Sequence, residues 1–110
     1  MTETIQSLEE AAHWEDEGGG RFQQTIADSW ANGPGAYGGI TAAALIRQME
    51  RVLGNVDQPI RTLGMHLCAP LRAEPSVMEV EVERRGRSIS HLRARIAQEG
   101  ECCATATANV

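Results

Sequence analysis

The hydrophobic positions in the C-terminal half of the chain recur every second residue, as in β-strands that have one buried face. The clearest run is residues 77–85, where Met78, Val80 and Val82 alternate with glutamates. Three further runs alternate in the same way, at residues 60–68, 91–98 and 102–110. A weaker alternation at residues 21–30 predicts one earlier strand. The pattern therefore predicts an early strand and a later meander of four antiparallel strands.

The charges on the second and third strands of this meander predict how the two strands pair. An odd-length loop over residues 86–88 would set Arg85 opposite Ile89. Each glutamate would then face a basic residue, in the pairs Glu83–His91, Glu81–Arg93 and Glu79–Arg95. This register puts opposite charges on one face and apolar residues on the other, whereas a two-residue turn would mix the faces. We interpret the charged pairs as a solvated face of the sheet.

Between the early strand and the meander, residues 40–53 lack the two-residue period and predict a helix. Its first half, residues 40–46, is apolar nearly all round, which is typical of a buried helix. Residues 32–35 favour a loop before the helix, and Gly54 is a stop signal after it. The order of strand, buried helix and four strands predicts an α+β fold. In this fold an antiparallel sheet wraps around one central helix.

Residues 1–20 are predicted to be an N-terminal lead-in to a single domain of residues 21–110. Ser7 and Glu10 have the spacing of a helix-capping pair, and the three glycines at residues 18–20 are expected to end any regular structure. The last predicted strand runs to Val110 without a polar tail. We therefore expect either a longer natural polypeptide or a truncation at this residue.

Composition narrows the classes of partner. The net charge of −5 does not favour nucleic-acid binding, which usually needs a basic face. No apolar run approaches the roughly 20 residues of a membrane-spanning helix, so no membrane partner is expected. The three cysteines are odd in number and two are adjacent, which favours neither a disulfide framework nor a metal site. A reducing cytoplasm is the expected location. With only 4% aromatic residues, the core is expected to gain stability from a second copy or a second half.

An ordered set of short motifs resembles the N-terminal half of type II, double-hotdog acyl-CoA thioesterases. The motifs are Trp30, Gly33-Pro34, Gly38-Gly39, the Ala-rich helix, Thr62-Leu63, Leu67-Cys68-Ala69-Pro70, Val80-Glu81-Val82, Gly86-Arg87-Ser88, and Arg95 to Gln98 with Gly100. The resemblance covers residues 21–110 and implies a hotdog fold. It also implies cleavage of acyl-CoA to a free fatty acid and coenzyme A, with no cofactor apart from the coenzyme A of the substrate. The partner it implies is a second hotdog half or a homodimer partner.

The same resemblance implies a catalytic set of polar residues. By position, Thr62 and Gln98 match the Thr and Gln of the family, and the helix position that carries the family's Asp falls near Thr41 or Ala42. No carboxylate stands there in this sequence. This departure implies that the residues are the N-terminal half's remnant of the site. The working Asp is then expected in a second half.

The chemistry of the candidate residues leaves alternatives open. Gly38 and Gly39 can stabilise an oxyanion through helix N-terminal amides and let an acyl group approach, or they can simply form a tight turn. Gln98 lies on an apolar strand face and could hold a water or cap a loop. Thr62 could orient the same water or simply favour a strand. Arg87, with its neighbouring arginines, could bind the phosphates of coenzyme A or belong to a solvated turn.

Four other reactive side chains have weaker functional interpretations. Asp28 could act as a base if the glycine loop folds back, although Asp28 and Glu50 are best interpreted as solvated acids. His66 lacks a neighbouring acid, which favours a buried or interface histidine, and Cys68 lacks an activating partner in sequence. The alternative to a thioesterase is a non-catalytic hotdog module for acyl binding or dimer assembly. A dehydratase would need a paired Asp and His, which the sequence does not offer.

Overall fold

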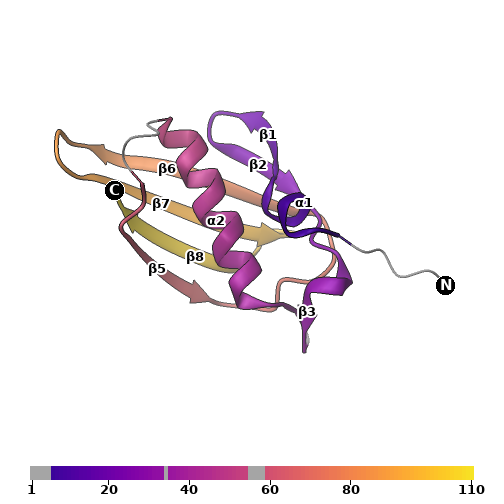
Figure 1. The fold of residues 1–110 in the computed structure, drawn as a ribbon. Helices are drawn as coiled ribbons and strands as arrows, with labels where there is room; N and C mark the ends of the chain where they lie inside the picture. The colour runs from indigo at the N-terminus through magenta and orange to yellow at the C-terminus, as the bar shows by residue number, and fades with distance from the viewer. Residues whose placement is uncertain (1–5, 34, 55–58) are drawn as a thin grey trace.

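The computed structural model describes residues 6–33, 35–54 and 59–110. One long helix, α2 (Gly38–Leu53), lies against a six-stranded antiparallel sheet (Figure 1). The other elements are α1 (Leu8–Ala12), β1 (Glu15–Gly18), β2 (Arg21–Gln24), a 3-10 helix (Asp28–Trp30), β3 (Ala31–Asn32), β4 (Gly35–Ala36), β5 (Thr62–Leu67), β6 (Ser76–Arg85), β7 (Ser90–Gln98) and β8 (Glu101–Asn109). This arrangement confirms the predicted α+β class, with an antiparallel sheet around one main helix. None of the helices in the described ranges is long and apolar enough to cross a membrane.

The order of strands across the sheet is β1-β2-β6-β7-β8-β5. The predicted meander is therefore wrong in one respect, because β5 pairs with β8 rather than with the strand that follows it. The edge of β6 that a meander would give to β5 is already occupied by β2, where Phe22 lies opposite Met78. The chain consequently crosses the end of the sheet between β5 and β6.

The β6–β7 hairpin confirms part of the predicted register. Glu81 lies opposite Arg93 and Glu79 opposite Arg95, as expected. The predicted pairing of Glu83 with His91 is wrong, because the register shifts between Val82 and Arg84 and leaves Glu83 as an extra residue on β6. The loop covers residues 86–89, one residue longer than expected, and the bulge restores the alternation of faces. Arg93 still pairs with Glu83, at 3.0 Å between Nε and Oε1.

The segment before residue 21 contributes to the same core as the rest of the domain. The predicted capping pair is present, since the Ser7 side chain accepts from the Glu10 amide and the Glu10 side chain accepts from the Ser7 amide. Trp14 is fully buried in the core, and its indole N–H donates to the Ala11 carbonyl. The glycines at residues 18–20 form the turn between β1 and β2, where they were expected to end regular structure.

Two predicted elements have different bounds in the structure. The early strand ends at Gln24, and residues 28–30 form a 3-10 helix in place of the predicted second half of the strand. The central helix begins at Gly38, two residues before the predicted start, so both glycines lie in its first turn.

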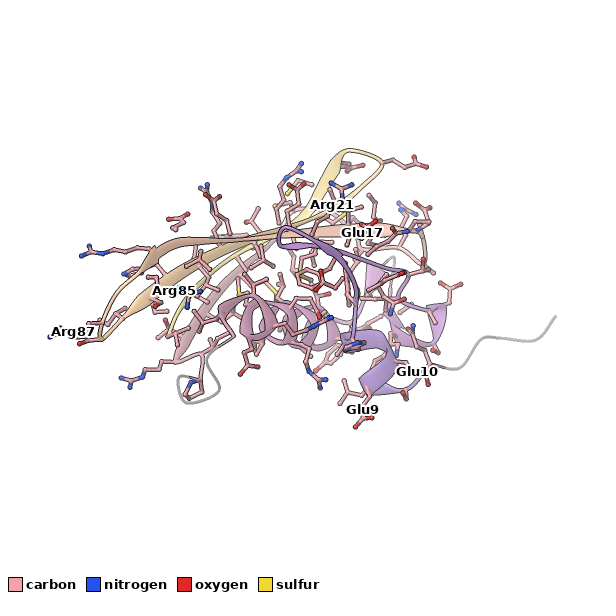
Figure 2. All side chains as sticks on the ribbon, turned by 90° about the horizontal axis from the view of Figure 1, so that it is seen from above. Glu9, Glu10, Glu17, Arg21, Arg85 and Arg87 are labelled. Atoms are coloured by element: carbon pink, nitrogen blue, oxygen red, sulfur yellow. The ribbon has the colours of Figure 1, made fainter. Side chains whose placement is uncertain are left out.

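Helix α2 buries one face against the sheet and leaves the other half-exposed (Figure 2). The buried face carries Ile40, Ala44, Leu45 and Met49, which join a single hydrophobic cluster with the small alanines of β8. The expectation that the first half is buried all round is wrong for part of its circumference, because Ala42, Ala43 and Ile46 are only half-buried. One sheet covers one side of a helix, so the opposite side meets solvent or another element.

The two edges of the sheet differ in charge. β1 carries three exposed acidic residues, Glu15, Asp16 and Glu17, and Glu17 pairs with Arg21 at 3.4 Å (Figure 2). β5 has no Asp, Glu, Arg or Lys, and its last residue, Leu67, is 59% exposed. Edge strands without charges present backbone N–H and C=O groups that can pair with another strand. The β5 edge is therefore the open side of this sheet.

Candidate active site

A cleft of about 330 Å³ lies at the N-terminal end of α2. Its walls are the first turn of the helix, the short β3–β4 hairpin and the chain that leaves β5 (Figure 1). The side chains at its surface are mainly apolar, and those used below are Asn32, Ala36, Thr41, Leu67, Leu71 and Cys103. Such a lining suits an acyl chain better than a charged ligand.

The first turn of α2, which brings Thr41 to the cleft, begins with two glycine amides. Tyr37 is the N-cap residue, and its side chain does not cap the helix. The amides of Ile40 and Thr41 both donate to the Tyr37 carbonyl, at 3.1 and 3.3 Å. Within the described ranges, the amides of Gly38 and Gly39 donate to no acceptor. Free amides at a helix N-terminus stabilise negative charge on an oxygen atom.

The two glycines differ in how much space surrounds them. A Cβ on Gly39 would lie 2.5 Å from Cε1 of Tyr37, whose ring covers the helix start and is 54% exposed. A Cβ on Gly38 would lie 3.6 Å from Cδ1 of Leu67, which is ordinary van der Waals contact. A methyl group at residue 39 would therefore displace the Tyr37 ring from its place, whereas residue 38 has room for a methyl group. The exposed Tyr37 and Leu67 flank the two free amides.

A third close contact fixes the β3–β4 wall. A Cβ on Gly35 would lie 2.8 Å from the Leu71 amide nitrogen, so only glycine lets β4 pack directly against the chain after β5. The Ala36 amide donates to the Leu71 carbonyl at 2.7 Å, and the Tyr37 amide donates to the Trp30 carbonyl at 2.8 Å. These contacts hold the hairpin against the start of α2 and so define the cleft.

Thr41, in the first turn of α2, brings a side-chain hydroxyl to the cleft. The residue is 1% exposed and lies at the surface of the cleft. Its hydroxyl hydrogen-bonds to no other residue in the described part of the chain, yet no fully buried side-chain oxygen or nitrogen there lacks a partner. The hydroxyl therefore faces the space of the cleft, where it can donate to or accept from a ligand.

Gln98 is buried at the end of β7, and its amide is engaged by the chain between β5 and β6. The Nε2 atom donates to the Arg72 carbonyl at 2.8 Å and to the Ser76 hydroxyl at 2.9 Å, with a longer bond of 3.3 Å to the Glu74 carbonyl. The Oε1 atom accepts from the Arg72 amide at 3.2 Å and from the Cys103 thiol at 3.7 Å. Gln98 thus anchors a loop, which is one of its two predicted roles, and touches a residue of the cleft through Cys103.

Burial raises the pKa of the Cys103 thiol, and the negative charge of Glu101 also raises it, while a hydrogen bond from Gln98 acts in the opposite direction. The thiol is 2% exposed and belongs to the hydrophobic core. A thiol with a raised pKa is a poor nucleophile at neutral pH. Cys103 is therefore part of the floor of the cleft rather than its reactive group.

The structure does not bring Thr62 to the cleft. Thr62 begins β5 opposite Asn109, whereas Gln98 lies opposite Glu101 at the other end of β8. This strand of nine residues separates the two side chains by roughly 25 Å. Thr62 is also exposed, so its predicted catalytic role has no counterpart in the geometry of this single chain.

Arg87 also lies away from the cleft. It projects from the tip of the β6–β7 hairpin, at the end of the sheet opposite the start of α2 (Figures 1 and 2). Its neighbour Arg85 turns back toward the helix and donates to the Leu53 carbonyl at 3.2 Å. Arg85 therefore satisfies a carbonyl at the C-terminal end of α2, where the helix dipole also favours a positive charge.

The remaining candidates lie outside the cleft or at its margin. Asp28 lines a neighbouring pocket on the other side of the β3–β4 hairpin, together with Arg72 and Glu74. Glu50 is exposed on α2, and His66 is exposed on the edge strand β5, which excludes the buried alternative for His66 and leaves the interface alternative open. Among the described residues that line the cleft itself there is no carboxylate. The general base that thioester hydrolysis by water requires is therefore missing from this set.

The model of the acyl-CoA thioesterase N-terminal domain matches residues 26–110. The chain belongs to this family. The match includes the whole cleft, from the 3-10 helix before it to the start of β8. No curated protein matched the sequence.

Solved structures show the fold of this acyl-CoA thioesterase N-terminal domain. A thioesterase II candidate from Thermobifida fusca YX superposes with a TM-score of 0.83 at 22% identity, over 94% of this chain and 38% of that protein. A hotdog-fold protein of unknown function from Alicyclobacillus acidocaldarius gives 0.78 at 27% identity, over 96% of this chain and 39% of that protein. A Bacillus halodurans protein solved with CoA gives 0.78 at 19% identity, over 96% and 75% of the two chains. The chain thus spans about two fifths of the first two proteins.

Two features of this acyl-CoA thioesterase domain were missed by the sequence analysis. One is the pair of exposed side chains, Tyr37 and Leu67, that flank the glycine amides. The contact of the Tyr37 ring with Gly39 gives no periodic signal in the sequence, although a tyrosine directly before two glycines is a pattern that could have suggested it. The other is the loop of residues 72–75, which leads into β6, binds Gln98 and has no helix or strand pattern. Only the tertiary structure brings these segments to the cleft.

Proposed function

We propose that this chain forms the N-terminal half-site of an acyl-CoA hydrolase. In this proposal the substrate is a fatty acyl-CoA, water is the nucleophile, and the products are a free fatty acid and coenzyme A. Coenzyme A enters only as part of the substrate. The observation that carries the proposal is the buried Thr41 hydroxyl in an apolar cleft, in the same helical turn as the amides of Gly38 and Gly39, which donate to no acceptor among the described residues.

Each part of the cleft supports one part of the reaction. The amides of Gly38 and Gly39, which donate to no acceptor among the described residues, are suited to the negative charge that develops on the thioester oxygen when water attacks its carbonyl carbon. The Thr41 hydroxyl is suited to a hydrogen bond with that oxygen or with the water. Leu67 and Leu71 offer an apolar surface to the first carbons of the acyl chain. Gln98 has a positioning role in this proposal, because its amide holds the loop that carries Arg72.

The second half-site supplies what the cleft lacks. The described residues of the cleft include no carboxylate, so we propose that a second hotdog unit brings the base that removes a proton from water. The uncharged β5 edge offers a place for this unit to pair. The unit is either a second half of a longer polypeptide or a second copy of this chain. That the chain spans 38% and 39% of two proteins of the same fold supports the first form.

The same observation also favours a second candidate function. A cleft with an oxyanion-binding turn and no base can bind an acyl-CoA without cleaving it. In this alternative the chain is a non-catalytic hotdog module for acyl binding or dimer assembly. One protein of the same fold was solved with CoA, which supports a CoA ester as the ligand in either case. We place both functions in the cytoplasm, in keeping with three cysteines that are free thiols.

A hydrolysis and binding assay separates these functions. Acyl-CoA esters of increasing chain length are incubated with the chain, and release of coenzyme A is followed with a thiol reagent after the signal of the protein thiols is subtracted. Binding of a non-hydrolysable acyl-CoA thioether is measured by calorimetry on the same sample. Hydrolysis supports the first function, and binding without hydrolysis supports the second. Absence of both would contradict the assignment of the cleft.

Matched variants test the cleft itself. Thr41→Val keeps the shape of the side chain and removes its hydroxyl, and it is expected to weaken hydrolysis or binding by about tenfold, the effect of one hydrogen bond. Thr107→Val is the control, because Thr107 is an exposed threonine on β8. Equal losses in both variants, or a loss only in the control, would show that the ligand binds elsewhere.

A further inference from the structure

The three cysteines, which are far apart in sequence, meet where β5 ends beside the start of β8. The Cys68 amide donates to the Cys103 carbonyl at 2.8 Å, and the next amide, that of Ala69, donates to the same carbonyl at 3.2 Å. The β5–β8 ladder, in which Leu67 lies opposite Ala104, thus continues one residue further. Cys68 is therefore next to both Cys102 and Cys103 across two hydrogen-bonded strands.

A register shift on β8 decides which of the two neighbouring thiols faces Cys68. Opposite β7, Ala104 pairs with Ile96 and Cys102 pairs with Ala97, so Cys103 is an extra residue on β8. Cys103 and Ala104 are both buried toward the helix, at 2% and 1% exposure. Cys102 is half-exposed and Cys68 is exposed. The two accessible thiols are therefore those of Cys68 and Cys102.

The thiols of Cys68 and Cys102 come from these neighbouring strands, and each donates to a carbonyl of its own strand, Cys68 to His66 at 3.9 Å and Cys102 to Ala104 at 3.7 Å. The pKa of the Cys68 thiol is raised by desolvation, by a hydrogen bond with the Cys102 side chain and by the charge that Cys102 can carry. A hydrogen bond from Thr105 and the positive charge of Arg95 act in the opposite direction. The backbone bonds of Cys68 and Ala69 to Cys103 and the influence of Cys102 on the Cys68 pKa both indicate that the two thiols are close at the end of β5.

We propose that Cys68 and Cys102 form a reversible dithiol–disulfide pair that exchanges with low-molecular-weight disulfides. One protein thiolate attacks a sulfur of the external disulfide, forms a mixed disulfide and releases one external thiol. The second protein thiol then loses its proton and attacks the mixed disulfide, which releases the second external thiol. The two cysteines are oxidised by two electrons, and the external disulfide is reduced to two thiols. The proposal does not depend on the hydrolase function.

The strand geometry suits such a bond. Disulfides need Cα atoms about 4.4–6.8 Å apart, and strands about 4.8 Å apart with an offset of one residue, about 3.3 Å, give a separation of roughly 6 Å for Cys68 and Cys102. β5 is an edge strand, so its end can adjust without disturbing a further neighbour. Cys103 is the wrong partner because its side chain points into the core. The bond would fasten the exit of β5, which forms one wall of the cleft, to β8.

The proposal is tested by oxidising the purified chain with oxidised glutathione and following intact mass and free thiols. The wild type is expected to lose the mass of two hydrogen atoms and to fall from three free thiols to one. Cys103→Ser is expected to lose the same mass and retain no free thiol. Cys68→Ser and Cys102→Ser are expected to lose the internal bond and to stop at a mixed disulfide with glutathione.

Peptide mapping of the oxidised wild type keeps the test valid if a variant fails to fold. After the remaining thiol is alkylated, cleavage at arginine is expected to join peptide 62–72 to peptide 96–110, with Cys103 carrying the alkyl group. Alkylation of Cys102 instead, or an internal bond that forms equally fast in Cys102→Ser, would assign the pair to Cys103 and overturn the proposal. A wild type that yields only mixed disulfides or covalently linked chains would also overturn it.

Discussion

Replacing Gln98 with alanine removes the side chain that ties the end of β7 to the loop of residues 72–75 and to the first residue of β6. We expect this change to destabilise the domain strongly, whatever its effect on catalysis. The structure gives the Gln98 amide two short donor bonds, to the Arg72 carbonyl and the Ser76 hydroxyl, and an acceptor bond from the Arg72 amide. The loop that they hold lies against the cleft, so stability and ligand binding are expected to change together.

The magnitude follows from these bonds. A typical hydrogen bond contributes about 0.5–1.5 kcal/mol to stability, so three bonds to a buried amide correspond to about 2–3 kcal/mol. Arg72 is exposed, and water can replace its lost partners, which keeps the effect near the lower end of this range. The Ser76 hydroxyl is buried but retains its bond to the Glu74 carbonyl at 3.1 Å. For a domain of this size the loss corresponds to a fall in Tm of about 10 °C.

The assay is thermal and urea unfolding of Gln98→Ala beside Gln23→Ala. Gln23 is an exposed glutamine on β2, so its truncation is expected to shift Tm by no more than about 2 °C. If Gln98→Ala unfolds like the wild type yet abolishes acyl-CoA hydrolysis, the anchoring role is wrong. The amide would then act on the substrate or its water, as the family resemblance implies.

Three further outcomes are expected. Gly39→Ala displaces the Tyr37 ring from the helix start and is expected to lower the free energy of unfolding in urea by about 1–3 kcal/mol. Gly38→Ala is the control and is expected to fold normally, so equal effects of the two changes would contradict the contact between Gly39 and Tyr37. The pKa of Cys68 is raised, so at pH 8 it has less thiolate than an ordinary cysteine, and iodoacetamide should alkylate it slowly. The alkylation rate should approach that of free cysteine as the pH rises, and it should be higher in Cys102→Ser; a rate equal to that of free cysteine at pH 8 refutes this prediction. Light scattering of the isolated chain is expected to show dimers, and a monomer at high concentration would contradict pairing through β5.

Local patterns predicted most of the fold because each element buries one face. The alternation of Met78, Val80 and Val82 placed the longest strand, and the charge pairs placed its register up to Glu81. The bulge at Glu83 was not predicted, because a bulge restores the alternation of faces after an extra residue and leaves little trace in the sequence. The position of β5 was also missed, because alternation shows which face is buried and not which strand is the neighbour.

The candidate site was predicted only where a single residue type carried the signal. Gly38 and Gly39 were found through their place before a helix, and Gln98 through its polar side chain on an apolar face. The partners of Gln98 come from a loop 22 to 26 residues away in sequence, so they could not be predicted from spacing. Thr62 and Gln98 were grouped by resemblance alone, and their opposite positions along β8 depend on strand pairing that the sequence does not reveal.

The unequal edges of the sheet determine how large an assembly this chain can build. The three acidic residues of β1 would repel the same strand of another copy, and an approaching β5 edge has no Arg or Lys to compensate them. The remaining way for two sheets to pair edge to edge is β5 of one copy against β5 of another, and this contact occupies the β5 edges of both copies. We therefore expect association to stop at two copies, because a copy paired in this way has no uncharged edge left from which a fibre could grow.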